Sequence, residues 1–229
     1  LRWLWIAVAD NFCCFSVHAR RGVDQLNAWF PNGYRGRVHC DRWRPYEIFD
    51  VEQRQLCWSH LLRDVQAIID RGCAGAPAAT RMLARAQAMF ASWRRFVADE
   101  IDRAALHDAT VRFRAAFRRF CLAGRSQRDD RKWRALGRDL LRQGPAVCHF
   151  LDVDGFDPTN NAAERALRTA VLWRRCSQGT RTETGSAFVG RILSVVATCK
   201  QQGRDILEYL GGALLAHRRG LPPPSLLPA

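Results

Sequence analysis

Lysine is almost absent from this sequence: Lys132 and Lys200 are the only two, although lysine and arginine together number 36 in 229 residues. Arginine therefore carries nearly all the positive charge, and its planar guanidinium suits bidentate contact with phosphate. Acidic residues number only 22, which leaves a formal net charge of +14. A balance this basic favours a polyanionic partner, with nucleic acid as the first candidate. The alternative is a basic protein that is merely soluble and sticky.

Long hydrophobic runs are also missing. No stretch approaches the ~20 apolar residues of a membrane span, and residues 1–8 are too short and too interrupted for a signal peptide. We find no internal repeat, no glycine-rich nucleotide loop and no serine-nucleophile motif. The nine cysteines follow no disulfide framework and fit a reducing cytosol. Cys57 and His60 have the spacing of half a zinc site, but no second pair accompanies them.

The patterns along the chain predict an α/β protein with one sizeable core and a smaller lobe. Residues 3–9 and 12–18 are rich in aromatic and β-branched side chains, which predicts paired strands. Residues 9–11 would form the hairpin turn between them. A short helix over 22–30 follows. Further strands are expected over 38–41 and 53–58, and then a helix from about residue 59 to residue 71, with apolar side chains on one face.

The remainder is predicted to be helical. Residues 76–143 are strongly arginine-rich, with Gly124 and Gly144 as helix breaks. A helix opening near Pro158 would lead to a loop over 174–185, followed by helices over 186–202 and 205–218. The proline-rich tail from residue 220 should be extended or disordered. The expected organisation is a first part of the core, a helical insertion, a returning core helix with C-terminal helices, and a tail, with boundaries 1–72, 73–150, 151–218 and 219–229.

One acidic residue lies at the mouth of a predicted helix. Residues 157–168 read DPTNNAAERALR, which offers several good N-cap residues and places Glu164 in the first helical turn. A carboxylate there could hold a metal ion while Arg165 and Arg168 face phosphates. The alternative needs no function, because Asn161 and Glu164 have the spacing of a capping box.

A second acidic residue follows a short predicted strand. Asp41 closes the sequence RVHCD, which glycines and Pro45 bracket. An acid at the junction of a strand and a loop can project into a cleft. Taken alone, Asp41 is better explained as an ordinary loop aspartate than as a functional residue.

Three blocks together resemble bacterial insertion-sequence transposases of the IS-sixty-six type. Residues 55–64 (QLCWSHLLRD) resemble the family's Cys-Trp-(Ala/Ser)-His-x-x-Arg block, and residues 40–46 (CDRWRPY) its Asp-x-(Tyr/Trp)-x-x-Tyr block. Residues 158–168 resemble the Asn-Asn-x-x-Glu-Arg block. The match continues at 177–180 and 197–200, so the resemblance runs in order over nearly the whole chain.

The resemblance implies a ribonuclease H-like mixed sheet and a triad of two aspartates and a glutamate. Asp41 matches the second acid and Glu164 the third. The family's first acid lies on the first strand of the sheet, in a block that is not found here, and Asp10 is no replacement because it lies in a predicted turn. We therefore expect a truncation upstream of Leu1 that removes this first strand.

The resemblance also implies a cofactor and roles for individual residues. Asp41 and Glu164 would bind Mg²⁺ or Mn²⁺, because hard oxygen ligands suit these ions. Asn160, Asn161 and His60 would support them. Phosphate contacts in DNA would come from five arginines: Arg165, Arg168, Arg174, Arg175 and Arg181.

The expected parent is a transposase that cleaves transposon ends and joins them to target DNA by two-metal chemistry, as a homodimer on DNA in the bacterial cytoplasm, associated with the nucleoid and not with a membrane. This chain, with two of three acids, is expected to be inactive alone. The main alternative is a non-catalytic DNA-binding remnant of a transposase. A third possibility is a helical protein–protein module, which would lack the salt-sensitive DNA affinity of the other two.

Overall fold

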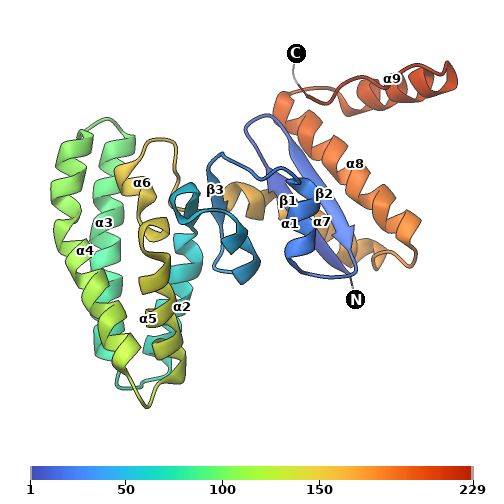
Figure 1. Ribbon diagram of the computed structural model, residues 1–229. Helices are drawn as coiled ribbons and strands as arrows, with labels where there is room; N and C mark the ends of the chain where they lie inside the picture. The colour runs from blue at the N-terminus through green and yellow to red at the C-terminus, as the bar shows by residue number, and fades with distance from the viewer. Residues whose placement is uncertain (1, 228–229) are drawn as a thin grey trace. The chain divides into compact units, whose positions relative to one another are not determined.

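The computed structural model describes residues 2–227 and divides the chain into two compact units. The terminal unit combines Leu1–Gly22 with Asn161–Ala229, and the central unit is Val23–Asn160. Helices hold 64% of the residues and the sheets are small (Figure 1), which confirms a mixed α/β protein. Within residues 2–227, no helix has both the length and the apolar character needed to cross a membrane. The domain boundaries drawn from the sequence stay predictions.

An antiparallel hairpin opens the terminal unit. β1 (Trp3–Val8) pairs with β2 (Cys13–His18). The amide of Ala9 donates to the carbonyl of Phe12 at 2.9 Å and closes the turn. Both predicted strands are confirmed, and Asp10 lies in the turn as expected.

Two helices cover this hairpin, α7 (Asn161–Ser177) and α8 (Glu183–Gln202). Gly190 lets α8 approach closely, because an added Cβ would lie 2.9 Å from the carbonyl oxygen of Phe15. Serine and threonine hydroxyls of α8 also accept hydrogen bonds from the backbone of β2. The resulting small core consists of five buried residues: Cys13, Phe15, Ala170, Val189 and Leu193.

The connection between α7 and α8 is shorter than the sequence predicts. The predicted loop over 174–185 is wrong at both ends, because α7 continues to Ser177 and α8 starts at Glu183. Gln178 and Gly179 have positive φ angles of 60° and 86° and end α7. Thr182 accepts from the amide of Gly185 at 3.0 Å and starts α8, an N-cap signal that the sequence analysis missed.

The last helix, α9 (Ile206–Arg218), buries none of its residues, and Asp205 caps its start through the amide of Glu208 at 2.7 Å. The tail up to residue 227 is irregular, and its carbonyls accept hydrogen bonds from the side chains of Gln202, Arg204 and Tyr209. The predicted extended form therefore holds for the described part of the tail. Leu1 and residues 228 and 229 lie outside the part of the chain that the structure describes.

A parallel pair of short strands organises the beginning of the central unit. After α1 (Val23–Trp29), β3 (Val38–Cys40) pairs with β4 (Arg54–Leu56). Two 3-10 turns connect these strands, over Arg44–Ile48 and Val51–Gln53. β4 is shorter than predicted, because Trp58 already belongs to the following helix. Among the described residues, these strands and the hairpin form two separate two-stranded sheets.

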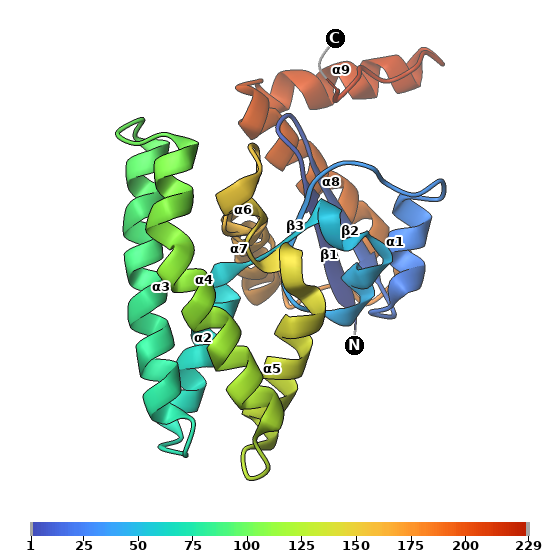
Figure 2. The same ribbon diagram turned by 60° about the vertical axis from the view of Figure 1, so that its left-hand side comes forward.

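Helices make up the rest of the central unit (Figure 2). Trp58, which is 1% exposed, packs its indole against three phenylalanines of α3 and α4: Phe90, Phe113 and Phe117. The helical bounds are α2 (Trp58–Asp70), α3 (Ala76–Val97), α4 (Arg103–Ser126), α5 (Arg131–Gln143), a 3-10 turn (Gly144–Val147) and α6 (His149–Asp152).

Two sequence-based expectations fail among these helices. Gly124 is not a break: α4 runs through it, and an added Cβ would lie 2.6 Å from the indole nitrogen of Trp133. The glycine therefore makes room for α5 to pack on α4. Pro158 is not a first helical residue either, since α7 starts at Asn161. The break at Gly144 is confirmed, because α5 ends at Gln143.

Candidate active site

Asp41 directly follows the carboxyl end of β3. Cys40 is 3% exposed and pairs with Leu56 of β4, which is fully buried. Because the two strands are parallel, their carboxyl ends meet at one edge, where ligand sites of such sheets commonly lie. Cys57 extends this edge, since its amide donates to the carbonyl of Cys40 at 2.8 Å. The strand pair thus brings Asp41 and the start of α2 together.

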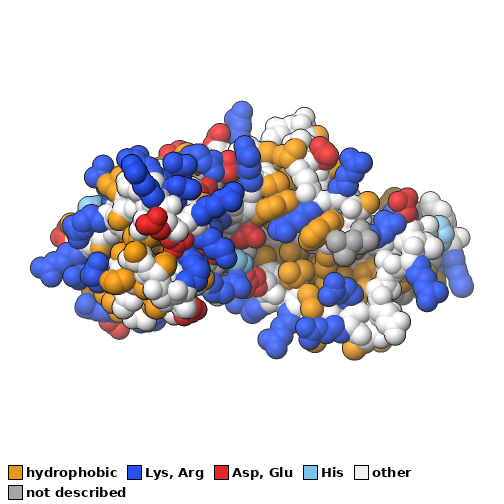
Figure 3. Space-filling model, turned by 90° about the horizontal axis from the view of Figure 1, so that it is seen from below, with side chains coloured by type: hydrophobic (Ala, Val, Ile, Leu, Met, Phe, Trp, Pro, Cys, Tyr) orange, Lys and Arg blue, Asp and Glu red, His pale blue; other side chains and the backbone are white. Residues whose placement is uncertain are grey.

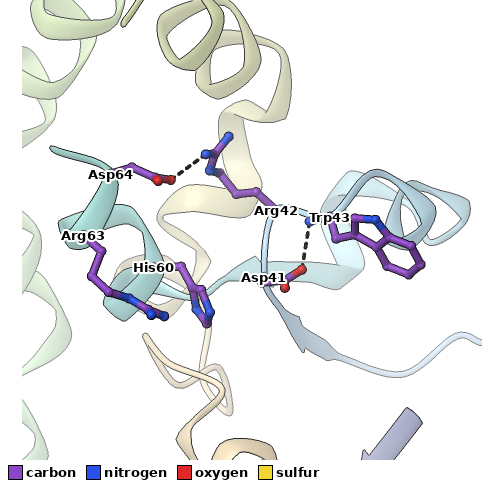
Figure 4. A pocket seen from close by; sticks show the side chains of 6 residues that line it. All are labelled: Asp41, Arg42, Trp43, His60, Arg63 and Asp64. Atoms are coloured by element: carbon purple, nitrogen blue, oxygen red, sulfur yellow. Dashed lines mark hydrogen bonds and ion pairs between the residues drawn. The ribbon is translucent and has the colours of Figure 1, made fainter. Parts of the chain in front are cut away.

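A hollow of about 350 Å³ opens at this edge (Figure 4). Its lining comes from the residues after β3 and from the first two turns of α2. Six side chains contribute: Asp41, Arg42, Trp43, His60, Arg63 and Asp64. The structure therefore brings the predicted residues Asp41 and His60 to one hollow.

The carboxylate of Asp41 is held by its own loop. One oxygen accepts a hydrogen bond from the amide of Trp43 at 2.8 Å. Within residues 2–227, its second oxygen accepts no hydrogen bond. The side chain is half-buried, so this oxygen is fixed in orientation and available to a ligand in the hollow.

Arg42 ties the same loop to two helices. Its guanidinium forms ion pairs with Asp64 of α2 and with Asp139 of α5, the latter at 2.6 Å. Burial lowers the pKa of Arg42, but hydrogen bonds and charge from the two carboxylates outweigh it, and the pKa is raised overall. Arg142 also contacts Asp139, at 2.7 Å, and pairs with both carboxylate oxygens of Glu47. The residue beside Asp41 is thereby anchored by a charged network.

Trp58 fixes the start of α2, which carries His60 and Arg63. Its amide donates to the carbonyl of Pro158 and its indole nitrogen to the carbonyl of Val147, both at 2.8 Å. Arg63 is exposed; its only hydrogen bond among the described residues goes from Nε to the carbonyl of Ser59 at 3.3 Å. The terminal guanidinium nitrogens are thus available at the hollow.

The nearby thiol and imidazole are poor candidates for metal binding. Burial raises the pKa of Cys40 to about 12, so its thiol remains protonated at neutral pH. Burial lowers the pKa of His39 and keeps its ring neutral, the form that binds metals, but its Nε2 already accepts a hydrogen bond from the amide of Asp157 at 2.8 Å. The hollow itself is lined by two carboxylates, two arginines, the imidazole of His60 and the indole of Trp43.

Glu164 belongs to the terminal unit, in the first turn of α7 as the sequence predicts. The predicted arginines lie along this helix and after it: Arg174 and Arg175 form its last turn, and Arg181 precedes α8. All five of them are exposed. Asn161 is the first residue of α7, while Asn160 is the last residue of the central unit.

The sequence-based predictions give no role to Arg42, Arg63, Asp64 or Asp139. Arg63 could have been found, because it ends the CWSHLLR block that was already recognised. Asp139 gave no signal, since it lies 97 residues from Arg42 inside an ordinary amphipathic helix.

Comparison with known proteins gives one match. The family model described as Transposase IS66 family matches residues 1–187. This range contains every residue named above as part of the site. No curated protein and no solved structure matches the chain.

Proposed function

The chain belongs to the Transposase IS66 family, and from this premise we propose that Asp41 and Glu164 hold the divalent cation of a DNA cleavage and strand-transfer reaction. The observation that carries the proposal is the position of Asp41. Its half-buried carboxylate follows the carboxyl end of a parallel strand and lines a hollow together with arginines. We further propose that the two small sheets are parts of a ribonuclease H-like mixed sheet.

The residues at the hollow fit Mg²⁺ or Mn²⁺. Both ions prefer hard oxygen ligands. One carboxylate oxygen of Asp41 accepts a hydrogen bond from the amide of Trp43, and the other is available to an ion. The hollow of about 350 Å³ has room for an ion that keeps several of its waters. A bound pair of such ions would polarise the phosphate and stabilise the attacking and leaving oxygens.

The protein's own groups would position the DNA. The available guanidinium nitrogens of Arg63 would neutralise a phosphate beside Asp41, in the bidentate geometry that arginine favours. His60 lines the same hollow and would support the carboxylate. Asn160 and Asn161 would orient the chain before Glu164.

The arginines of α7 and its following loop offer further phosphate contacts in the terminal unit. Figure 3 shows Lys and Arg side chains spread over much of the visible face, with fewer Asp and Glu. We propose that Arg165, Arg168, Arg174, Arg175 and Arg181 contact phosphates of transposon ends or target DNA. Two copies would act together, one on each transposon end.

Two acids make a weak site. The family's first-acid block is not found in the 229 residues, so we expect the chain alone to bind one ion loosely and to join DNA strands poorly. Robust strand transfer by the chain as it stands would contradict this expectation. Supplying an upstream segment with the first-acid block should restore activity.

The metal proposal is tested by titrating the chain with Mn²⁺ and following the EPR signal of the free ion. Asp41→Asn and Glu164→Gln should each weaken Mn²⁺ binding at least tenfold, because each removes a charged oxygen ligand. Matched controls are Asp108→Asn, an exposed acid of α4, and Glu183→Gln, which lies in the first turn of α8 just as Glu164 does in α7.

The controls should bind as the wild type does. If Glu183→Gln weakens binding as much as Glu164→Gln, the effect is general electrostatics and the assignment of Glu164 is wrong. DNA binding that persists in both site variants, without any strand transfer even after the upstream segment is supplied, would favour the non-catalytic remnant.

A further inference from the structure

A second hollow of about 560 Å³ lies between α2, α5 and the 3-10 turn at residues 44–48. It shares Arg42 and Asp64 with the hollow at Asp41, so the two hollows adjoin within the central unit; the larger one is called the groove below. Ala67 and Ala135 line it with small, exposed side chains, which leave the groove open between the helices. A ligand lying along it would end at Asp41.

The charges in this groove favour an anion. Its lining holds five cations and three acids. The three acids are already compensated: Asp64 by Arg42, Glu47 by Arg142, and Asp139 by both arginines.

Two cations of the groove have no such compensation. Arg44 and Lys132 are exposed and form no ion pair with any of residues 2–227. They come from two different elements of the lining, Arg44 from the 3-10 turn and Lys132 from α5. A linear polyanion could contact both.

We propose that this groove is a track for the backbone of duplex DNA that leads to Asp41, an inference that rests on the proposed function. The lining of the groove contains no aromatic side chain, and in the adjoining hollow the ring of Trp43 packs against Tyr46, with ring centroids 5.7 Å apart, whereas grooves for single strands use aromatic rings on which bases stack. Contacts would therefore go to phosphates, through Arg44 and Lys132, and would be independent of sequence.

The test compares two charge-matched double variants. Arg44→Gln with Lys132→Gln removes the uncompensated cations of the groove. Arg81→Gln with Arg85→Gln removes two exposed arginines of α3, which line neither hollow. Affinity for a labelled duplex of arbitrary sequence is measured by fluorescence anisotropy between 50 and 200 mM salt, in EDTA so that no metal contributes.

The groove variant should flatten the plot of log affinity against log salt by about 0.9 per lost phosphate contact, hence by close to 2 in all. The control should retain the wild-type slope. Equal slopes in the two variants would show that the groove does not bind the DNA backbone. Tighter binding of a single strand of equal length, or displacement of the duplex by submillimolar inorganic phosphate, would overturn it as well.

The outcomes separate this inference from the proposed function. If the wild type binds duplex DNA and the groove variant matches its control, only the groove is wrong. If the wild type shows no salt-dependent DNA binding, the proposed function fails with it.

Discussion

The two units bury very different amounts of apolar side chain. The main buried cluster of the central unit contains 23 residues, whereas that of the terminal unit contains five. Asp41 belongs to the first unit and Glu164 to the second. The two proposed metal ligands thus rest on scaffolds of unequal size, and since apolar burial is the main stabilising term in folding, the smaller scaffold should be the more easily lost.

The largest effect on stability is expected from truncating one buried side chain in the core of each unit. Trp58→Ala should cost about 3–5 kcal/mol of unfolding free energy in the central unit, because it removes a fully packed indole. Phe15→Ala, in a core of only five residues, should unfold the terminal unit outright. Hydrogen exchange read by mass spectrometry should show α3 and α4 losing protection in the first variant, and α7 and α8 in the second.

Trp3→Ala provides a control for this experiment, because Trp3 is 37% exposed. It should leave exchange in both units close to the wild-type pattern. If either core variant deprotects all helices equally, the units unfold as one and the comparison between them breaks down.

A smaller effect should appear as acid sensitivity confined to the central unit. Asp130, whose side chain is 8% exposed, starts α5. Burial alone would raise the pKa of Asp130, but hydrogen bonds from Cys73, the Trp133 amide and Arg71 outweigh it and lower the pKa from 3.8 to about 2. A depressed folded-state pKa stabilises above the unfolded value and loses that contribution as pH falls through the folded value.

Asp130→Asn should therefore lower the unfolding free energy by about 2 kcal/mol at pH 7, and the gap to wild type should close as the pH falls from about 4 to 2. Urea titrations at several pH values measure this. Asp205→Asn is the counterpart in the terminal unit, because Asp205 also caps a helix, and asparagine caps nearly as well as aspartate. A gap that persists unchanged at low pH would show that the charge of Asp130 contributes nothing.

The smallest effect is expected on the affinity for Mn²⁺ at the hollow beside Asp41. Asp139→Asn removes one of the two carboxylates that hold Arg42 and should weaken Asp41-dependent Mn²⁺ binding about tenfold, the lower end of the range for loss of a group that supports a metal ligand. Asp152→Asn is the control, because it likewise removes a carboxylate that is paired with an arginine, Arg114, elsewhere in the same unit. Equal Mn²⁺ affinities in the two variants would show that Arg42 does not position the loop of Asp41.

Local patterns in the sequence predicted much of this fold. The hairpin, the strand before Asp41 and most helices follow from alternation, apolar periodicity and breakers that act over a few residues. The first-turn position of Glu164 follows from the same signals. The predicted helix bounds failed where a residue type that often ends a helix served another purpose. Gly124 has the composition of a break but serves as a packing surface for Trp133.

The support around Asp41 could not be predicted. Arg42 reaches Asp139 across 97 positions of sequence, and nothing local marks that aspartate as its partner. The same holds for Gln143, which accepts from buried Arg54 at 2.7 Å. Such pairs arise only when helices pack, so they depend on the tertiary fold and not on the propensity of a segment.

The hydroxyl groups of α8 decide at which edge the hairpin can accept another strand. Thr198 and Ser194 already take the outward amides of Cys13 and Phe15 on β2, at 3.1 and 2.8 Å. This edge of β2 is therefore protected from pairing with a strand of another molecule, the route by which open edge strands polymerise. Any additional strand that extends this sheet, from this chain or another, would have to dock alongside β1.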